Sequence, residues 1–240
     1  GQCNAVSDQV VITIAPSPIV DAGAAIAVCA NNTNAQMSGS VLNAAGGTWS
    51  GAGTFSPSAT NLNATYSPTA AEVAAGTAIV TLTSTGMGLC NAVSDNLTIT
   101  FTPAPVVEAG ASQTLCANNA AMQLAGSVTG AAGGNWSGGA GAFAPNATAL
   151  NGVYTPSNAE IAAGSLWLFL TSTGNGGCNS ARDSVQVFFT QAPTVNAGVD
   201  AHVCANDVEV DLSGAVTVAT GGVWSGGAGS FSPNNTALNA

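Results

Sequence analysis

Cysteine is the residue type in this sequence with the widest possible chemistry, and it occurs six times in 240 residues. A cysteine thiolate can bind a metal, attack a substrate or enter a disulfide. Metal sites typically use a Cys-x-x-Cys pair, which is absent. A catalytic cysteine needs a histidine partner, and the sequence has one histidine, His202. The pattern therefore predicts disulfides, and with them an oxidising compartment.

The cysteines are spaced as a sequence repeat. Cys29 recurs as Cys116 and Cys204, at intervals of 87 and 88 residues. Such self-similarity predicts a tandem array of similar domains. The same two intervals separate Cys3, Cys90 and Cys178; Trp49, Trp136 and Trp224; and Pro18, Pro105 and Pro193.

The repeat divides the chain into four parts. Each copy opens on a proline segment (PIVDAG, PVVEAG or PTVNAG), where proline favours an extended linker and ends strand pairing. We expect the C-terminal end of one repeat at 1–17, complete repeats at 18–104 and 105–192, and the N-terminal half of a further repeat at 193–240. Incomplete repeats at both ends indicate a section of a longer protein.

Apolar and polar residues alternate within each repeat, as they do in strands with one buried face. The period is clearest in TAIVTLTSTG at 77–86 and SLWLFLTSTG at 165–174. Seven or so short strands without a long helix are typical of an immunoglobulin-like sandwich. The expected fold class is all-β, as tandem immunoglobulin-like or PKD-like sandwiches of 87 to 88 residues.

One helical turn is predicted before the penultimate strand of each repeat. A Ser or Thr followed three residues later by Glu can form a capping box, and a following glycine can end the helix in the left-handed conformation. These roles fall to Thr69, Glu72 and Gly76 in one repeat and to Ser157, Glu160 and Gly164 in the next.

One tryptophan stands at a fixed strand position in each repeat. This placement indicates the buried tryptophan of an immunoglobulin-like core; the alternative is an exposed platform on which sugars stack. We assign to the structural core Trp49, Trp136, Trp224, Tyr66 and Tyr154.

Two disulfide pairings fit the spacing. Within a repeat, Cys29–Cys90 and Cys116–Cys178 close loops of 61 and 62 residues, whereas bonds across the linkers (Cys3–Cys29, Cys90–Cys116, Cys178–Cys204) close loops of 26. Loop entropy differs too little between these lengths to decide. We favour the pairing within repeats, because the first and last strands of a sandwich can be neighbours. Cys3 and Cys204 then have partners outside the sequence.

Eleven acidic residues and one Arg give the chain a net charge of −10. Nucleic acids and anionic membrane surfaces are bound through basic side chains, so the composition excludes both as ligands. No apolar stretch reaches the roughly 18–20 residues that insertion into a membrane requires.

Only Asp207, Glu209 and Asp211 alternate as calcium ligands could, and the other repeats lack them. We expect no cofactor, with calcium as the alternative.

The motifs VDAG, VCANN, GGTWSG, TLTSTG and GCN together resemble a known type of repeat over the whole chain. It is the immunoglobulin-like or PKD-like repeat of very large secreted surface proteins of Bacteroidetes, including mobile adhesins of gliding bacteria. The resemblance implies export to the bacterial cell surface. It also implies a role in adhesion or in an extracellular filament.

We expect no enzyme, because the sequence has no Ser–His–Asp set and no repeated acid pair. The expected function is a structural segment of a giant adhesin or filament, forming a disulfide-stabilised rod. A polysaccharide-binding array and a stalk for a distant domain are the alternatives. The expected partners are neighbouring repeats of the same chain; other copies in a filament and surface glycans are further candidates.

Arg182 is the only Lys or Arg residue, so trypsin has one possible site. We predict that the native chain resists trypsin, because Arg182 follows a turn that contains a disulfide cysteine. The unfolded chain should give two fragments on a gel after timed digestion. Rapid cleavage of the native chain would mean that this turn is more mobile than a clamped hairpin allows.

Overall fold

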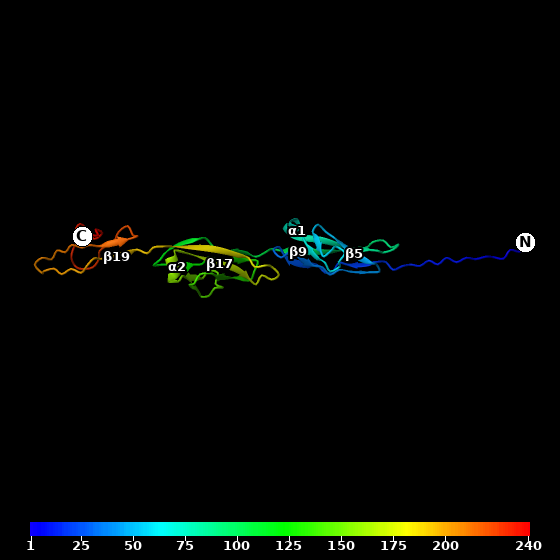
Figure 1. The fold of residues 1–240 in the computed structure, drawn as a ribbon, viewed down its shortest axis with the longest axis horizontal. Helices are drawn as coiled ribbons and strands as arrows, with labels where there is room; N and C mark the ends of the chain where they lie inside the picture. Colours follow the sequence, from blue (N-terminus) through cyan, green and yellow to red (C-terminus); the bar gives the residue numbers. More distant parts are fainter. The chain divides into compact units, whose positions relative to one another are not determined.

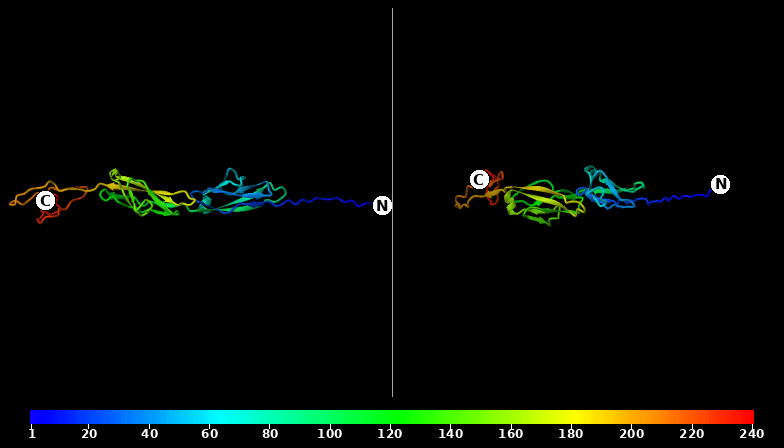
Figure 2. Two further views of the ribbon diagram at one scale, coloured as in Figure 1. Left: turned by 90° about the horizontal axis from the view of Figure 1, so that it is seen from below. Right: turned by 45° about the vertical axis from the view of Figure 1, so that its right-hand side comes forward.

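A computed structural model describes all 240 residues and contains twenty short strands and two six-residue helices. The predicted all-β fold class is confirmed. Figure 1 shows the strands gathered into sandwiches, with β5, β9 and α1 in the first complete repeat and β17 and α2 in the second. Two further views, in Figure 2, show no long helix on any side.

The two complete repeats contain the same elements in the same order. The first repeat contains β1 (Ile19–Asp21), β2 (Ile26–Cys29), β3 (Ala35–Gln36), β4 (Ser40–Leu42), β5 (Gly46–Ser50), β6 (Thr54–Ser56), β7 (Thr65–Ser67), α1 (Ala70–Ala75), β8 (Thr77–Thr85) and β9 (Ser94–Thr102). The second contains β10 (Val106–Glu108), β11 (Gln113–Cys116), β12 (Met122–Gln123), β13 (Ser127–Thr129), β14 (Gly133–Ser137), β15 (Ala142–Ala144), β16 (Val153–Thr155), α2 (Asn158–Ala163), β17 (Ser165–Thr173) and β18 (Arg182–Thr190).

Each complete repeat has a four-stranded and a three-stranded sheet. In the first repeat the strand orders are β2-β9-β8-β5 and β3-β7-β6, and β1 pairs with β4. The second repeat has the matching orders β11-β18-β17-β14 and β12-β16-β15, with β10 paired to β13. β8 and β9 form a long antiparallel hairpin, whereas β2 runs parallel to β9, with Cys29 opposite Thr102. β11 runs parallel to β18 in the same way.

The core lies between the two sheets of each repeat. Alternate residues of β8 are buried, as the period-2 pattern predicts. From the four-stranded sheet, Trp49 and Leu82 enter the core, and Tyr66 enters it from the three-stranded sheet. Gly39 has a packing role here, because a Cβ on this residue would lie 2.7 Å from both the Trp49 ring and a Leu82 methyl.

The chain divides into two compact units. Unit 1 comprises Gly1–Val106, Val128–Ala132 and Ser172–Ala181; unit 2 comprises Val107–Ser127, Gly133–Thr171 and Arg182–Ala240. The tip of the β17–β18 hairpin, Ser172–Ala181, therefore belongs to unit 1.

The outer parts of the chain contain little regular structure. Residues 1–17 form no strand and are exposed. Residues 193–240 contain only the antiparallel pair β19 (Thr194–Asn196) and β20 (Ala215–Thr217). Strands need a neighbouring strand to pair with, and residues 1–17 pair with none, although the Ser17 and Pro16 carbonyls accept from the Asn43 amide and the Cys90 thiol.

Candidate functional site

The one disulfide in the structure joins Cys29, at the end of β2, to Cys178, in the β17–β18 hairpin, with their Cα atoms 5.0 Å apart. This bond corrects the predicted pairing, in which Cys29 was matched with Cys90 and Cys116 with Cys178. Cys3, Cys90, Cys116 and Cys204 are unpaired. The bonded residues are 149 positions apart, more than one repeat length, so the bond connects successive copies of the repeat.

The direction of the strands explains the correction. β2 and β9 are neighbours, as the prediction required, but they are parallel. Cys29 therefore lies beside the C-terminal end of β9, whereas Cys90 precedes its N-terminal end at Ser94. Nine residues of strand span about 30 Å at roughly 3.3 Å per residue. This exceeds the Cα separation of about 4.4–6.8 Å that a disulfide allows.

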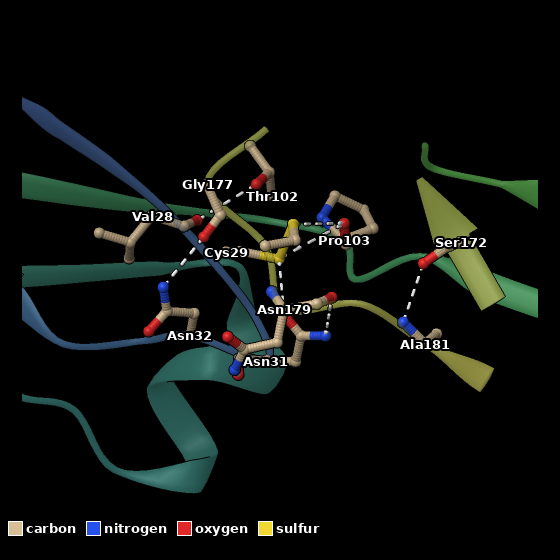
Figure 3. Close-up of a disulfide and its surroundings, with 11 residues drawn as sticks. Val28, Cys29, Asn31, Asn32, Thr102, Pro103, Ser172, Gly177, Asn179 and Ala181 are labelled. Carbon is tan, nitrogen blue, oxygen red and sulfur yellow. Dashed lines mark hydrogen bonds between the residues drawn. A yellow bond between two sulfur atoms is a disulfide. The ribbon is translucent and has the colours of Figure 1, made fainter. Parts of the chain in front are cut away.

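Asparagine side chains hold the hairpin against the turn that follows β2 (Figure 3). The Asn31 and Asn32 side-chain amides donate to the backbone carbonyls of Asn179 and Gly177, each at 3.0 Å. In return, Asn179 donates from its backbone N–H to the Asn31 side chain at 3.0 Å, and from its side chain to the Asn31 carbonyl at 2.6 Å. The contact therefore has four hydrogen bonds besides the covalent bond.

The Cys29–Cys178 bond is also packed against the linker backbone. The two sulfur atoms lie 3.9 and 3.8 Å from the same Pro103 carbonyl oxygen. Cys29 itself is only 1% exposed. The bond thus lies where β2, the end of β9 and the hairpin meet, all within unit 1.

The asparagines are not among the site residues predicted from the sequence. A signal for them existed: asparagine follows two residues after Cys29, Cys116 and Cys204, as Asn31, Asn118 and Asn206. It also directly follows the hairpin cysteines, as Asn91 and Asn179. Asparagine is so common in this sequence that its recurrence beside the cysteines does not by itself indicate a function.

A second polar network joins the core tyrosine to the helix cap. The Tyr66 hydroxyl, at the buried end of the side chain, donates to Glu72 at 2.7 Å and accepts from the Gly53 N–H at 2.8 Å. Glu72 also accepts from the Thr69 N–H at 2.8 Å, and the Thr69 hydroxyl accepts from the Glu72 N–H. Both halves of the capping box are present, and Gly76 ends α1 with φ of 78°.

The second repeat builds the same network. Tyr154 donates to Glu160 at 2.7 Å and accepts from Gly141 at 2.8 Å. Ser157 and Glu160 form the capping box of α2, which Gly164 ends with φ of 81°. The network therefore belongs to the repeat rather than to one copy.

Burial, and then the hydrogen bond to a carboxylate, raise the pKa of both tyrosines to about 12. Burial also disfavours the charged form of Glu72 and Glu160, but hydrogen bonds outweigh it, first those donated by the backbone of Thr69 and Ser157 respectively. The pKa of each glutamate is therefore lowered. Neutral tyrosine and ionised glutamate are the forms that the folded repeat stabilises.

Two aspartates after the hairpin cysteines tie β9 and β18 to the start of their repeats. Asp95 accepts from the Ala22 N–H at 2.8 Å, and Asp183 accepts from the Ala109 N–H at 2.7 Å.

No three His, Cys, Asp or Glu side chains gather as metal ligands would. The chain also has no helix with the length and apolarity that crossing a membrane requires.

The repeated tryptophans occupy equivalent places. Trp49 and Trp136 are buried, and their indole N–H groups donate to the carbonyls of Leu62 and Leu150 at 3.3 and 3.2 Å. The Trp224 indole N–H donates instead to the carbonyl of Ala237, one residue before the equivalent leucine, at 3.0 Å. Trp224 is only half-buried, beside a hollow of about 300 Å³. Residues 193–240 contain only the two-stranded sheet β19-β20, whereas in the complete repeats the tryptophan lies on a four-stranded sheet that faces a three-stranded one.

One group of aromatic side chains is exposed. Trp167 and Phe188, on β17 and β18, are 48% and 41% exposed. The Arg182 guanidinium lies over the Phe169 ring, 3.9 Å from its centroid. The position of Trp167 is held by Ile79 in the first repeat, so the group varies between repeats.

No protein-family model and no curated protein matches the sequence. Solved structures with similarity include Drosophila N-cadherin EC1-4 (14% identity, TM-score 0.38, 73% of this chain and 50% of that one) and mouse cadherin-23 EC22-24 (13%, 0.39, 74% and 67%). A titin I67–I69 variant is similar at 10% identity and a TM-score of 0.40, over 85% of this chain and 77% of that one. This chain thus spans half of the N-cadherin structure. These likenesses carry no functional argument.

The tyrosine network predicts a loss of stability at alkaline pH. A tyrosine whose folded pKa is raised stabilises the fold fully below its unfolded pKa of about 10, and that stability is lost as pH rises toward 12. Tyr66 and Tyr154 are the only tyrosines. Tyrosinate absorbance should therefore show a native midpoint near 12, together with unfolding, and a midpoint near 10 in guanidinium chloride.

Removing the ionisable group provides the control for this titration. The Tyr66→Phe/Tyr154→Phe variant should be less stable at neutral pH, because Glu72 and Glu160 lose a donor. It should also lose much less stability between pH 10 and 12 than the native chain. A native titration midpoint near 10 without unfolding would contradict the network.

Proposed function

We propose that the chain is a structural repeat segment of a very large secreted surface protein, an adhesin or extracellular filament in which sandwich domains act as linked spacers. The observation that carries the proposal is the Cys29–Cys178 bond, which connects successive copies of the repeat. Such a bond limits how far the chain can lengthen when it is pulled. An adhesin or filament that carries tension uses this property.

The resemblance to Bacteroidetes surface repeats supports the same proposal. A disulfide requires an oxidising compartment, in agreement with export from the cell. The expected partners are neighbouring repeats of the chain and other copies in a filament. A stalk that holds a distant domain away from the surface would use the same mechanical property, and it remains the closest variant of this function.

The proposal predicts a mechanical difference between the oxidised and reduced chain. When the chain is pulled from its ends, an intact Cys29–Cys178 bond removes the residues it encloses from the force path. Reduction should release the 149-residue loop and add about 500 Å of extension, at roughly 3.3–3.6 Å per residue. Single-molecule force spectroscopy with and without a reducing agent measures this length.

The Cys29→Ser/Cys178→Ser variant is the matched control. It should extend by the longer distance in both conditions and should still show two sandwich unfolding events. Equal extension of the native chain with and without reductant would remove the observation on which the proposal rests.

A second candidate function, binding of surface glycans, is favoured by the exposed aromatic group on β17 and β18. Aromatic faces stack on sugar rings, and the Trp167 and Phe188 side chains are accessible. Arg182 adds hydrogen-bond donors to the same face. The group has no equivalent in the first repeat, and variation between repeats is typical of recognition rather than packing.

Glycan binding predicts that a soluble β-glucan or mannan retards the native chain in affinity electrophoresis. Trp167→Ala should abolish the retardation while preserving the fold. Trp167→Ile, which installs the residue found at the same place in the first repeat, should also abolish it. Unchanged migration of the native chain in both polysaccharides would count against this function, and it would leave the mechanical proposal intact.

A further inference from the structure

The turn that holds Cys29 is built a second time at Cys116. The Cys116 sulfur lies 3.9 Å from the Gln191 carbonyl oxygen, the distance that also separates the Cys29 sulfur from Pro103. The Asn119 N–H donates to the Cys116 carbonyl at 2.8 Å, and the matching bond in the first turn is 3.0 Å. The turn is therefore formed although Cys116 has no disulfide partner.

The surface beside Cys116 is open, whereas the surface beside Cys29 is covered. Cys29 and Phe101 are 1% and 6% exposed, while their equivalents Cys116 and Phe189 are only partly buried. A hollow of about 330 Å³ lies next to Cys116, with Phe189 and Ile161 in its wall. The visible difference at Cys29 is the hairpin that is bonded to it (Figure 3).

The hairpin that contains the second cysteine of the bond also occurs in both complete repeats. Cys90 lies in the β8–β9 hairpin as Cys178 lies in the β17–β18 hairpin, and its sulfur is 3.9 Å from the Pro16 carbonyl oxygen. The corresponding distance from Cys178 to Pro103 is 3.8 Å. Cys90 is unpaired, and the neighbouring Leu89 is fully exposed. The Cys90 hairpin thus has the same local geometry as the Cys178 hairpin, but it is not bonded to a turn like that of Cys29.

We propose that the Cys29–Cys178 bond is one example of a bond that recurs between every two successive repeats. Cys116 forms a disulfide with the hairpin cysteine of the following repeat. Asn118 and Asn119 bind the backbone of that hairpin as Asn31 and Asn32 bind the Cys178 hairpin. The Cys90 hairpin, in turn, enters the open turn of a preceding repeat. Each repeat contributes one cysteine at each end, and no repeat contains a bond of its own.

The chemistry of each bond is thiol–disulfide exchange. Two cysteine thiols lose two protons and two electrons, and one S–S bond forms. A disulfide oxidant, either a dithiol–disulfide oxidoreductase or glutathione disulfide, accepts the electrons and leaves as two thiols. The hydrogen bonds of the asparagines align the two segments before the exchange.

The pairing of Cys116 is tested with an extended chain, in which a second copy of residues 153–192 follows Ala240. This addition completes the repeat that begins at 193. After oxidative refolding with glutathione, Cys116 should change from fully alkylated, as in the 240-residue chain, to protected. Non-reducing peptide mapping should show Cys116 linked to the added copy of Cys178. Cys116→Ser in the extended chain should leave the added cysteine alkylatable and Cys29–Cys178 intact.

Three outcomes would overturn the proposal. They are a bond between the added cysteine and Cys204, which would be a bond within one repeat; a free Cys116 in a folded extended chain; and a Cys116 bond only between separate molecules. Circular dichroism and protease resistance establish whether the added repeat has folded.

A second extended chain tests the pairing of Cys90 independently. It decides the proposal if the first extended chain fails to fold. A copy of residues 18–87 placed before Gly1 completes the preceding repeat. Cys90 should then become protected and linked to the added copy of Cys29, whereas Cys90→Ser should leave that copy free. A folded chain in which Cys90 stays alkylatable would also overturn the proposal.

Discussion

The parallel pairing of β2 with β9 is the constraint on which the rest of this architecture depends. Most neighbours in a sandwich of hairpins are antiparallel, and an antiparallel pair would bring Cys29 toward the hairpin that contains Cys90. The parallel register instead places Cys29 beside Thr102, at the end where β9 leaves the domain. A repeat built in this way has a cysteine at each end, so its own two cysteines lie too far apart to bond to each other.

The local features of the fold could be predicted from sequence, because each depends on neighbouring residues. Alternation over nine residues identified β8 and β17, and the three-residue spacing of Thr69 and Glu72 identified the start of α1. The cysteine pairing could not be predicted in this way. It depends on the relative direction of two strands more than sixty residues apart, which the side-chain pattern of neither strand encodes.

The low content of basic residues explains how the carboxylates are held. With one Arg in the chain, buried or half-buried acids cannot rely on ion pairs. Backbone N–H groups replace the missing cations at Glu72, which accepts from Thr69, and at Asp95, which accepts from Ala22. Hydrogen bonds of this kind stabilise the ionised form and are directional. The acids therefore fix loop positions as well as contributing negative charge.

A disulfide between repeats has a different physical effect from one within a repeat. A bond within a domain reduces the entropy of that domain's unfolded state and stabilises it against denaturation. A bond between copies, such as Cys29–Cys178, encloses parts of two repeats in one 149-residue loop, so either can unfold without releasing chain to a pulling force. The bond also lowers the entropy of the unfolded chain, as a bond within a repeat would, and in addition it limits extension. The sandwich cores around Trp49 and Trp136 stabilise the individual repeats. A bond between copies therefore limits extension even when a repeat that it encloses has unfolded.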